Sequence, residues 1–241
     1  MMKKIRGLAE AGLRWVFEPV VGLLTRRHVH PNVLSSIGFL VTCSSGYFFH
    51  QHHVRTAGLL ILLGGLFDLF DGTVARRTGL ASAFGAFYDS TLDRLSEIVV
   101  YLGLLSLYND YRLELGDVAM IYWIVLAMGG SLMISYTRAR AEGLNVECHV
   151  GLMQRAERVI LIGLAALLFG ESTLAGQQGL VLKVVIVALA VLTNLTAVQR
   201  IWWVYRSTRP SGEPRMGAGT GGARPETEET PDPSSHTAPS A

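Results

Sequence analysis

The sequence from residue 68 to residue 93, DLFDGTVARRTGLASAFGAFYDSTLD, decides the fold because it places four aspartates at the edges of two hydrophobic segments. Asp68 and Asp71 are three residues apart, and Asp89 and Asp93 are four residues apart. Residues at these spacings share one face of an α-helix. The turn between the pairs predicts that the two helices pack antiparallel. We therefore expect the four carboxylates to converge at one spot near the cytoplasmic membrane surface.

Four carboxylates at one spot predict a metal site. Acids inside membrane segments are costly and are functional by default, and like charges at short range cannot all stay ionised without cations. Hard divalent cations with oxygen ligands resolve this conflict, and Mg²⁺ or Mn²⁺ fits best. Two such ions ~3.5–4 Å apart suit a phosphoryl-type displacement. A structural interpretation, with Asp71 capping a turn and Asp93 paired with Arg94, explains one or two acids and not four.

Outward from this stretch the chain has the composition of a membrane protein. Half of the 241 residues are hydrophobic, the mean hydropathy is +0.35, and only 17% of the residues are charged. A helix needs about 20 apolar residues to cross a bilayer. We predict an all-α bundle of six transmembrane helices, at residues 33–50, 54–76, 82–108, 117–138, 157–172 and 179–204, of which the fifth is the shortest.

The basic residues predict the orientation of these spans. If the N-terminus is cytoplasmic, 17 of the 21 Lys and Arg fall on the cytoplasmic side and three on the outer side. This asymmetry predicts a multi-pass protein of the cell membrane, with both termini and the aspartates facing the cytoplasm. The net charge of +2 is too small to indicate a nucleic-acid partner. Two cysteines, Cys43 and Cys148, do not form a disulfide framework.

The two ends of the chain differ from its middle. Residues 1–30 combine apolar residues at helical spacing with several Lys and Arg, which predicts an amphipathic helix on an anionic lipid surface. Residues 31–205 form the predicted transmembrane domain. Residues 206–241 become rich in Pro, Gly, Ser, Thr and Glu, and such a segment cannot bury enough apolar surface to fold. We expect a disordered cytoplasmic tail there.

A second cluster on the predicted cytoplasmic side is basic. It comes from the end of the fourth span, the start of the fifth and the end of the sixth, and consists of Arg138, Arg140, Arg155, Arg158 and Arg200. Several arginines beside a metal site suit an anionic, phosphorylated acceptor. Ordinary enrichment of basic residues on the cytoplasmic side is the competing interpretation for any one of them.

The pattern D-x-x-D-G-x-x-A-R, eight residues, G-x-x-x-D-x-x-x-D resembles the signature of the CDP-alcohol phosphatidyltransferases, and the resemblance covers roughly residues 5–205. It implies metal-dependent transfer of a phosphatidyl group from CDP-diacylglycerol to a hydroxyl, within a membrane homodimer. Asp68, Asp71 and Asp89 would be metal ligands. Asp93 would be the general base and a further ligand. The residues implied to contact CDP-diacylglycerol are Gly72, Ala75, Arg76 and Gly85.

The pattern Y-x-[KR]-A-R-A-E, then R-x-E-R, then V-Q-R resembles the phosphatidylinositol-phosphate synthase branch of that family. The resemblance implies that Arg138, Arg158 and Arg200 hold the phosphate of inositol 1-phosphate. Arg138 stands where lysine is usual, and Ala156 stands where proline is common. The alternative acceptor is sn-glycerol 3-phosphate, which would make the chain a phosphatidylglycerophosphate synthase. Alternatives of other classes are an intramembrane prenyltransferase and a cation transporter.

Overall fold

The structure is a computed structural model that describes residues 18–27, 29–109, 117–148, 150–151, 153–174 and 177–208. The elements after the first helical stretch are α2 (Pro31–His50), α3 (Val54–Thr78), α4 (Ala83–Asn109), α5 (Val118–Glu142), α6 (Arg155–Phe169), β1 (Thr173–Leu174), β2 (Gln177–Gln178) and α7 (Leu180–Thr208). The two strands pair antiparallel. Residues 18–26 are also helical. The rest of the predicted amphipathic helix, residues 1–17, and the tail from residue 209 lie outside the described residues.

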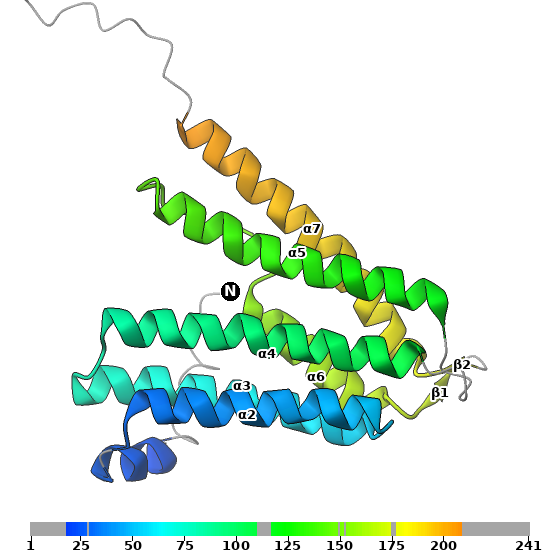
Figure 1. Cartoon of the computed structure of the whole chain (residues 1–241), viewed down its shortest axis with the longest axis horizontal. Coiled ribbons are helices and arrows are strands. Elements are labelled where there is room, and N and C mark those ends of the chain that lie inside the picture. The colour runs from blue at the N-terminus through cyan, green and yellow to red at the C-terminus, as the bar shows by residue number, and fades with distance from the viewer. Residues whose placement is uncertain are drawn as a thin grey trace, which may run out of the picture. The chain divides into compact units, whose positions relative to one another are not determined.

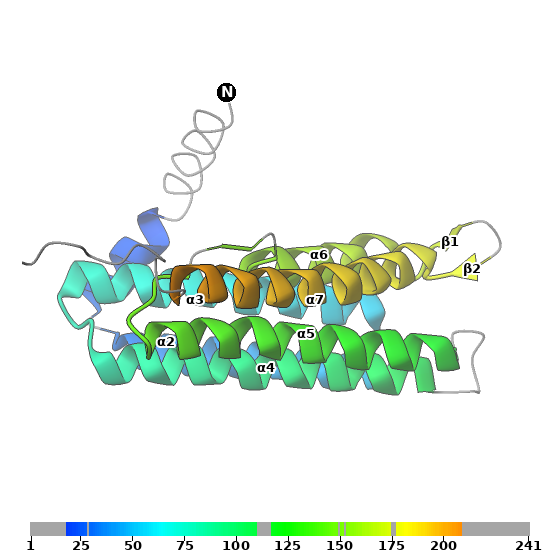
Figure 2. The same ribbon diagram turned by 90° about the horizontal axis from the view of Figure 1, so that it is seen from above.

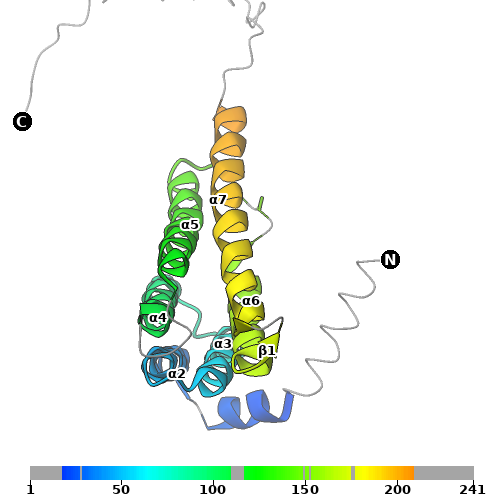
Figure 3. The same cartoon turned by 90° about the vertical axis from the view of Figure 1, so that its right-hand side faces the viewer.

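The six helices α2 to α7 are arranged as a closed ring of neighbours (Figures 1 and 3). Around the ring, α2 contacts α3, α3 contacts α6, α6 contacts α7, α7 contacts α5, α5 contacts α4, and α4 returns to α2. Each helix places apolar side chains into a shared core, which includes Phe49, Ile61, Leu104, Ile124, Ala166 and Ile186. This arrangement confirms the predicted all-α fold.

Helices α2 and α4 approach each other closely because glycines face each other where they cross. A β-carbon added to Gly103 would lie 2.6 Å from the Cα atom of Gly46, which is closer than real side chains come to backbone. Small residues at such crossings let helices pack backbone to backbone in a membrane. The pair therefore fixes the position of α4, the helix that carries Asp89 and Asp93, relative to α2.

Four of the six predicted spans are long and apolar enough to cross a membrane, namely α2, α3, α5 and α7. The other two differ for separate reasons. α4 has 27 residues but carries four charged residues, Asp89, Asp93, Arg94 and Glu97. α6 has only 15 residues, fewer than a bilayer requires. The chain is a multi-pass membrane protein by these apolar helices, and the count of six spans stays a prediction.

The structure corrects one expectation about the two helices that bear the aspartates. We expected α3 and α4, which are joined by the short turn at 79–82, to pack directly against each other. Instead, α2 packs against both, and α3 and α4 make only sparse contacts with one another. The physical reason is that small residues of α2 let both helices pack closely on it: a β-carbon on Gly38 would lie 2.8 Å from Phe67 of α3, and one on Gly46 would lie 2.8 Å from Val99 of α4. The gap between α3 and α4 is the place where the functional residues gather.

Candidate functional site

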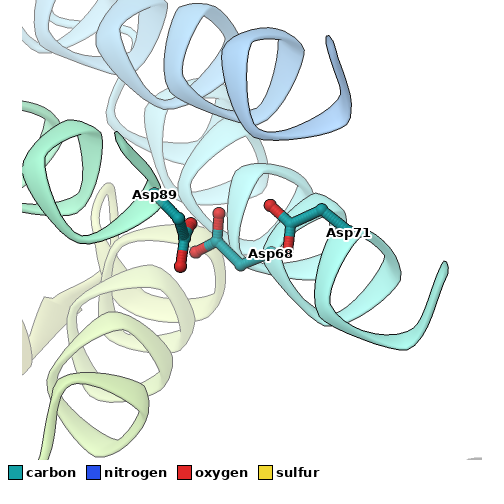
Figure 4. Close-up of side chains that lie close together, drawn as sticks. All are labelled: Asp68, Asp71 and Asp89. Carbon is teal, nitrogen blue, oxygen red and sulfur yellow. The ribbon is translucent and has the colours of Figure 1, made fainter. Parts of the chain in front are cut away.

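Three of the four predicted metal ligands come together. One carboxylate oxygen from each of Asp68, Asp71 and Asp89 lies within 4.8 Å of the other two. Figure 4 shows Asp68 and Asp71 on successive turns of α3, with Asp89 reaching toward Asp68 from α4. Asp71 is buried, and the other two are half-buried. The helical spacing therefore predicted correctly which acids of α3 share a face and that α4 supplies a partner.

Asp71 is held in place by α2, which sequence reasoning did not include in the site. The hydroxyl of Ser35 donates to Oδ2 of Asp71 over 2.6 Å, and Ser35 is itself buried. A hydrogen bond to a carboxylate is short and strong because the acceptor is charged. It orients one oxygen of Asp71 and leaves the other available.

Asp93 lies beside the three-carboxylate cluster and is linked to it by an arginine. Nη2 of Arg155 lies 2.7 Å from Oδ1 of Asp93, and Nη1 of the same guanidinium lies 2.5 Å from Oδ2 of Asp68. Among the described residues, Asp93 is therefore not a member of the close group but shares Arg155 with it. The sequence predicted Arg155 as one of several basic residues and gave no reason to pair it with the aspartates.

The donor set fits a hard divalent cation. Asp68, Asp71 and Asp89 offer only carboxylate oxygens, which are the ligands that Mg²⁺ and Mn²⁺ prefer. The three acids repel each other in a half-buried setting, so a cation between them would lower the energy of the folded protein. Asp93 is outside this group and is joined to Asp68 through the guanidinium of Arg155.

A cavity of about 240 Å³ opens beside the carboxylates between α2, α3 and α4. Its walls include all four residues predicted to contact CDP-diacylglycerol, together with residues of α2 and the turn: Pro31, Asn32, Ser35, Gly72, Ala75, Arg76, Ser82 and Gly85. Asp71 and Asp89 line it as well. A β-carbon on Gly72 would meet only the guanidinium of Arg76, at 3.6 Å. The space in front of this glycine is therefore open to a ligand.

A second cavity, of about 690 Å³, lies on the other side of the cluster between α4, α5, α6 and α7. Its charged lining consists of five arginines and three acids, namely Arg94, Arg138, Arg155, Arg158, Arg200, Asp93, Glu97 and Glu142. All three predicted acceptor-phosphate residues are among them. Ala86 lines both cavities, so the two adjoin near the aspartates. Because the arginines outnumber the acids, this second cavity has the positive charge that an anionic ligand requires.

Arg158 is held by a residue that the sequence did not single out. Its Nε and Nη2 donate to the two carboxylate oxygens of Glu97 over 2.7 and 3.1 Å, and its Nη1 donates to the carbonyl of Met153. The side chain of Arg158 is 2% exposed and that of Glu97 is 11% exposed. Arginine has five N–H donors, so donors remain for a ligand. In the sequence, the one indication of a role for Glu97 is that a glutamate stands within a predicted apolar span.

The other two predicted phosphate ligands differ in their surroundings. Arg200 is buried and donates to two backbone carbonyls, those of Val150 at 2.9 Å and Ile134 at 2.7 Å. It therefore ties α7 to α5 and to the loop before α6. Arg138 is exposed and pairs with Glu142 over 2.8 Å on the next turn of α5. Arg200 is fixed by the fold, whereas Arg138 can move to meet a ligand.

Known proteins match this chain over nearly all of its described length. Residues 28–204 match the CDP-alcohol phosphatidyltransferase family. An archaetidylinositol phosphate synthase of Methanothermobacter thermautotrophicus is 35% identical over 79% of this chain and 93% of that protein. A phosphatidylinositol phosphate synthase of Cutibacterium acnes is 30% identical over 82% of this chain and 96% of that protein.

Solved structures give the same result. The Mycobacterium tuberculosis phosphatidylinositol phosphate synthase with CDP-diacylglycerol bound has a TM-score of 0.69 and 28% identity to this chain, covering 83% of it and 97% of that enzyme. The same enzyme is also known in complex with manganese and citrate, again with a TM-score of 0.69. The family match spans most of the sequence and includes the aspartates and both cavities. The chain therefore belongs to the CDP-alcohol phosphatidyltransferase family.

Proposed function

We propose that this protein transfers the phosphatidyl group of CDP-diacylglycerol to a hydroxyl of inositol 1-phosphate and releases CMP. The observation that carries the proposal is the pair of adjoining cavities on either side of one carboxylate cluster. One cavity has the glycine-lined wall of a nucleotide site, and the other is lined by arginines. A transfer between two bound substrates requires such a shared boundary, because the reacting atoms must meet.

The donor would occupy the smaller cavity. The open space before Gly72 lets a nucleotide approach the backbone of α3. Arg76 stands beside this space and would pair with a phosphate group of the donor. The M. tuberculosis relative has CDP-diacylglycerol bound, which supports the choice of donor. Asn32 and Ser82, which line the same cavity, add polar groups at its rim.

Asp68, Asp71 and Asp89 would hold Mg²⁺ or Mn²⁺, and Asp93 would complete the ligands of a second ion. The relative that binds manganese supports the choice of metal. When bound, the cations neutralise negative charge on the diphosphate and on the leaving CMP. The protein's own contribution is to fix the carboxylates, through Ser35 for Asp71 and through the two helices for the others.

Asp93 would act as the general base. It lines the arginine-rich cavity, where it would accept the proton of the acceptor hydroxyl. The resulting oxygen would form a bond to the phosphorus attached to diacylglycerol. The bond from that phosphorus to the CMP oxygen would break, and CMP would leave with the electron pair. The arginines Arg138, Arg158 and Arg200 would bind the phosphate of the acceptor and so place its hydroxyl beside Asp93.

The membrane arrangement proposed with this function has six spans, with the aspartates and both termini on the cytoplasmic side. The distribution of Lys and Arg supports the orientation. Helices α2 to α7 run alternately up and down the bundle, and the site lies at the end where α3 joins α4 (Figure 1). We also propose a homodimer, which the family resemblance supports.

The test is an acceptor panel with the purified enzyme in detergent. CDP-diacylglycerol or its ether-linked archaeol counterpart is supplied with Mg²⁺, and inositol 1-phosphate, sn-glycerol 3-phosphate, serine and inositol are offered in parallel. We expect CMP release with inositol 1-phosphate only, and none in EDTA. Release only with sn-glycerol 3-phosphate would assign the alternative acceptor. Divalent-cation flux in proteoliposomes without CMP release would instead identify a transporter.

A further inference from the structure

Arg155 contacts two of the proposed metal-site aspartates, and the proposed reaction gives it no role. Its guanidinium lies between Asp68, at 2.5 Å, and Asp93, at 2.7 Å, and its side chain is 29% exposed. We propose that Arg155 is an exchangeable counter-cation. It neutralises the carboxylates when no divalent metal is present, and metal binding releases it to bind the acceptor phosphate in the neighbouring cavity.

The position of Arg155 in its own helix indicates that the carboxylates hold it there. Arg155 is the first residue of α6. The N-terminus of a helix carries partial positive charge, so a cation there is disfavoured. Helix α6 itself therefore gives no electrostatic reason for an arginine at this place. The acids of α3 and α4, which lie on the neighbouring helices, supply the attraction.

Competition between Arg155 and a metal follows from a shared ligand. Asp68 belongs to the three-carboxylate group and also accepts a hydrogen bond from Nη1 of Arg155. A divalent cation bound to Asp68 and Asp93 would lie between the two carboxylates that the guanidinium of Arg155 now contacts. Two positive charges cannot share that position without repulsion. Metal binding and the Arg155 contacts therefore exclude each other in part.

The guanidinium also has an unsatisfied donor in its present place. Among the described residues, Nε of Arg155 is one of the few buried side-chain atoms without a hydrogen-bond partner. A buried donor without a partner is unfavourable, because it has lost its hydrogen bonds to water. This cost favours a second position whenever another anion is present. Arg155 already lines the cavity that contains Arg158 and Arg200, so a phosphate bound there lies within its reach.

The exchange predicts that metal and acceptor promote each other's binding. A metal ion that displaces Arg155 adds a phosphate ligand to the second cavity, and a phosphate that attracts Arg155 vacates the metal ligands. Linkage requires the two effects to be equal, and coupling of this kind is on the order of 5–150-fold. The inference deepens the proposed function, but its test measures binding and needs no turnover.

The experiment titrates Mn²⁺ into the full-length purified protein without donor lipid, by calorimetry, and records the apparent Tm in EDTA and in Mn²⁺. We expect Arg155→Gln to bind Mn²⁺ on the order of 10-fold more tightly than the wild type. We also expect Arg155→Gln to have a lower Tm than the wild type in EDTA but not in Mn²⁺, because in EDTA its carboxylates have no counter-charge. Arg155→Lys keeps the charge and should show a smaller gain in affinity. Arg206→Gln, an exposed arginine of α7 outside both cavities, should match the wild type.

A second titration, with inorganic phosphate, tests where Arg155 goes. Mn²⁺ should strengthen phosphate binding to the wild type, and Arg155→Gln should lose most of that gain. Unchanged or weaker Mn²⁺ binding by Arg155→Gln, with a Tm lowered equally in EDTA and Mn²⁺, would show a purely structural arginine and overturn the proposal. If Arg155→Gln does not fold, Arg155→Met decides, because a neutral side chain cannot compete with Mn²⁺, and equal Mn²⁺ affinity in it and the wild type overturns the exchange. If Arg155→Gln binds Mn²⁺ more tightly than the wild type, but the wild type releases no CMP with inositol 1-phosphate, only the proposed acceptor is overturned.

Discussion

Replacing Glu97 should test most directly whether an ion pair holds Arg158 in place in the arginine-lined cavity. Glu97 makes a two-bond ion pair with Arg158, whose side chain is only 2% exposed. Replacing Glu97 by alanine leaves the guanidinium buried with one backbone partner, the carbonyl of Met153. Removing one member of a buried ion pair costs about 3–5 kcal/mol, because the remaining charge is not compensated.

This cost can be converted into a melting temperature. For a chain of 150–250 residues, each kcal/mol lowers the Tm by about 2–4 °C, so Glu97→Ala should lower it by about 6–20 °C. Glu97→Gln keeps an oxygen acceptor for Arg158 and should lower it less. Because Arg158 loses its orientation, the KM for inositol 1-phosphate should also rise, while the KM for CDP-diacylglycerol should stay the same.

The assay is thermal unfolding in detergent at a fixed scan rate, followed by tryptophan fluorescence, together with initial rates of CMP release. The matched control is Glu171→Ala, which removes a glutamate from an exposed pair with Arg55 outside both cavities. Exposed pairs contribute about 0–1 kcal/mol, so the control should shift the Tm by no more than about 4 °C. If Glu97→Ala melts like Glu171→Ala and keeps its KM for the acceptor, the ion pair does not position Arg158.

Three further changes test other parts of the site. Asp93→Asn should abolish CMP release while Mn²⁺ still raises the Tm, because the base is lost but the three-carboxylate group remains; normal turnover would exclude Asp93 as the base. Arg200→Ala should raise the KM for the acceptor more than that for the donor, and equal effects in a kinetic titration would argue against a phosphate ligand. Gly103→Ala should destabilise the protein by about 1–3 kcal/mol, since the new β-carbon would press on the backbone of Gly46; an unchanged Tm would mean that α2 and α4 adjust without cost.

The sequence predicted the grouping of Asp68, Asp71 and Asp89 because their relation is local. The spacing of Asp68 and Asp71 fixes their shared face on one helix, whatever the rest of the chain does. The same holds for the wall of the smaller cavity, since Gly72 and Arg76 are four residues apart on α3. Asp89 joins them because the turn that links α3 to α4 is short. These contacts depend on the helical periodicity of α3 and on the single turn between α3 and α4.

The contacts that sequence reasoning missed all join helices that are distant along the chain. Ser35 is 36 residues before Asp71, Arg155 is 87 residues after Asp68, and Glu97 and Arg158 are 61 residues apart. Nothing in the periodicity of one helix tells which residue of another will face it. The closed ring that brings α2 and α6 beside α3 is a property of the whole bundle, so these pairs required coordinates.

The short length of α6 has an explanation in these same contacts. Asp93 and Glu97 lie 10 and 14 residues after the start of α4, so at 1.5 Å per residue they are about 15 and 21 Å along it. Their partners, Arg155 and Arg158, are in the first turn of α6. Helix α6 must therefore begin deep within the bundle, as Figure 2 shows. Its N-cap residue Gln154 and its first residues Arg155, Ala156 and Arg158 line the arginine-lined cavity. Helix α6 is therefore short because it begins in the middle of the bundle. This starting point places Arg155 and Arg158 in the proposed acceptor site.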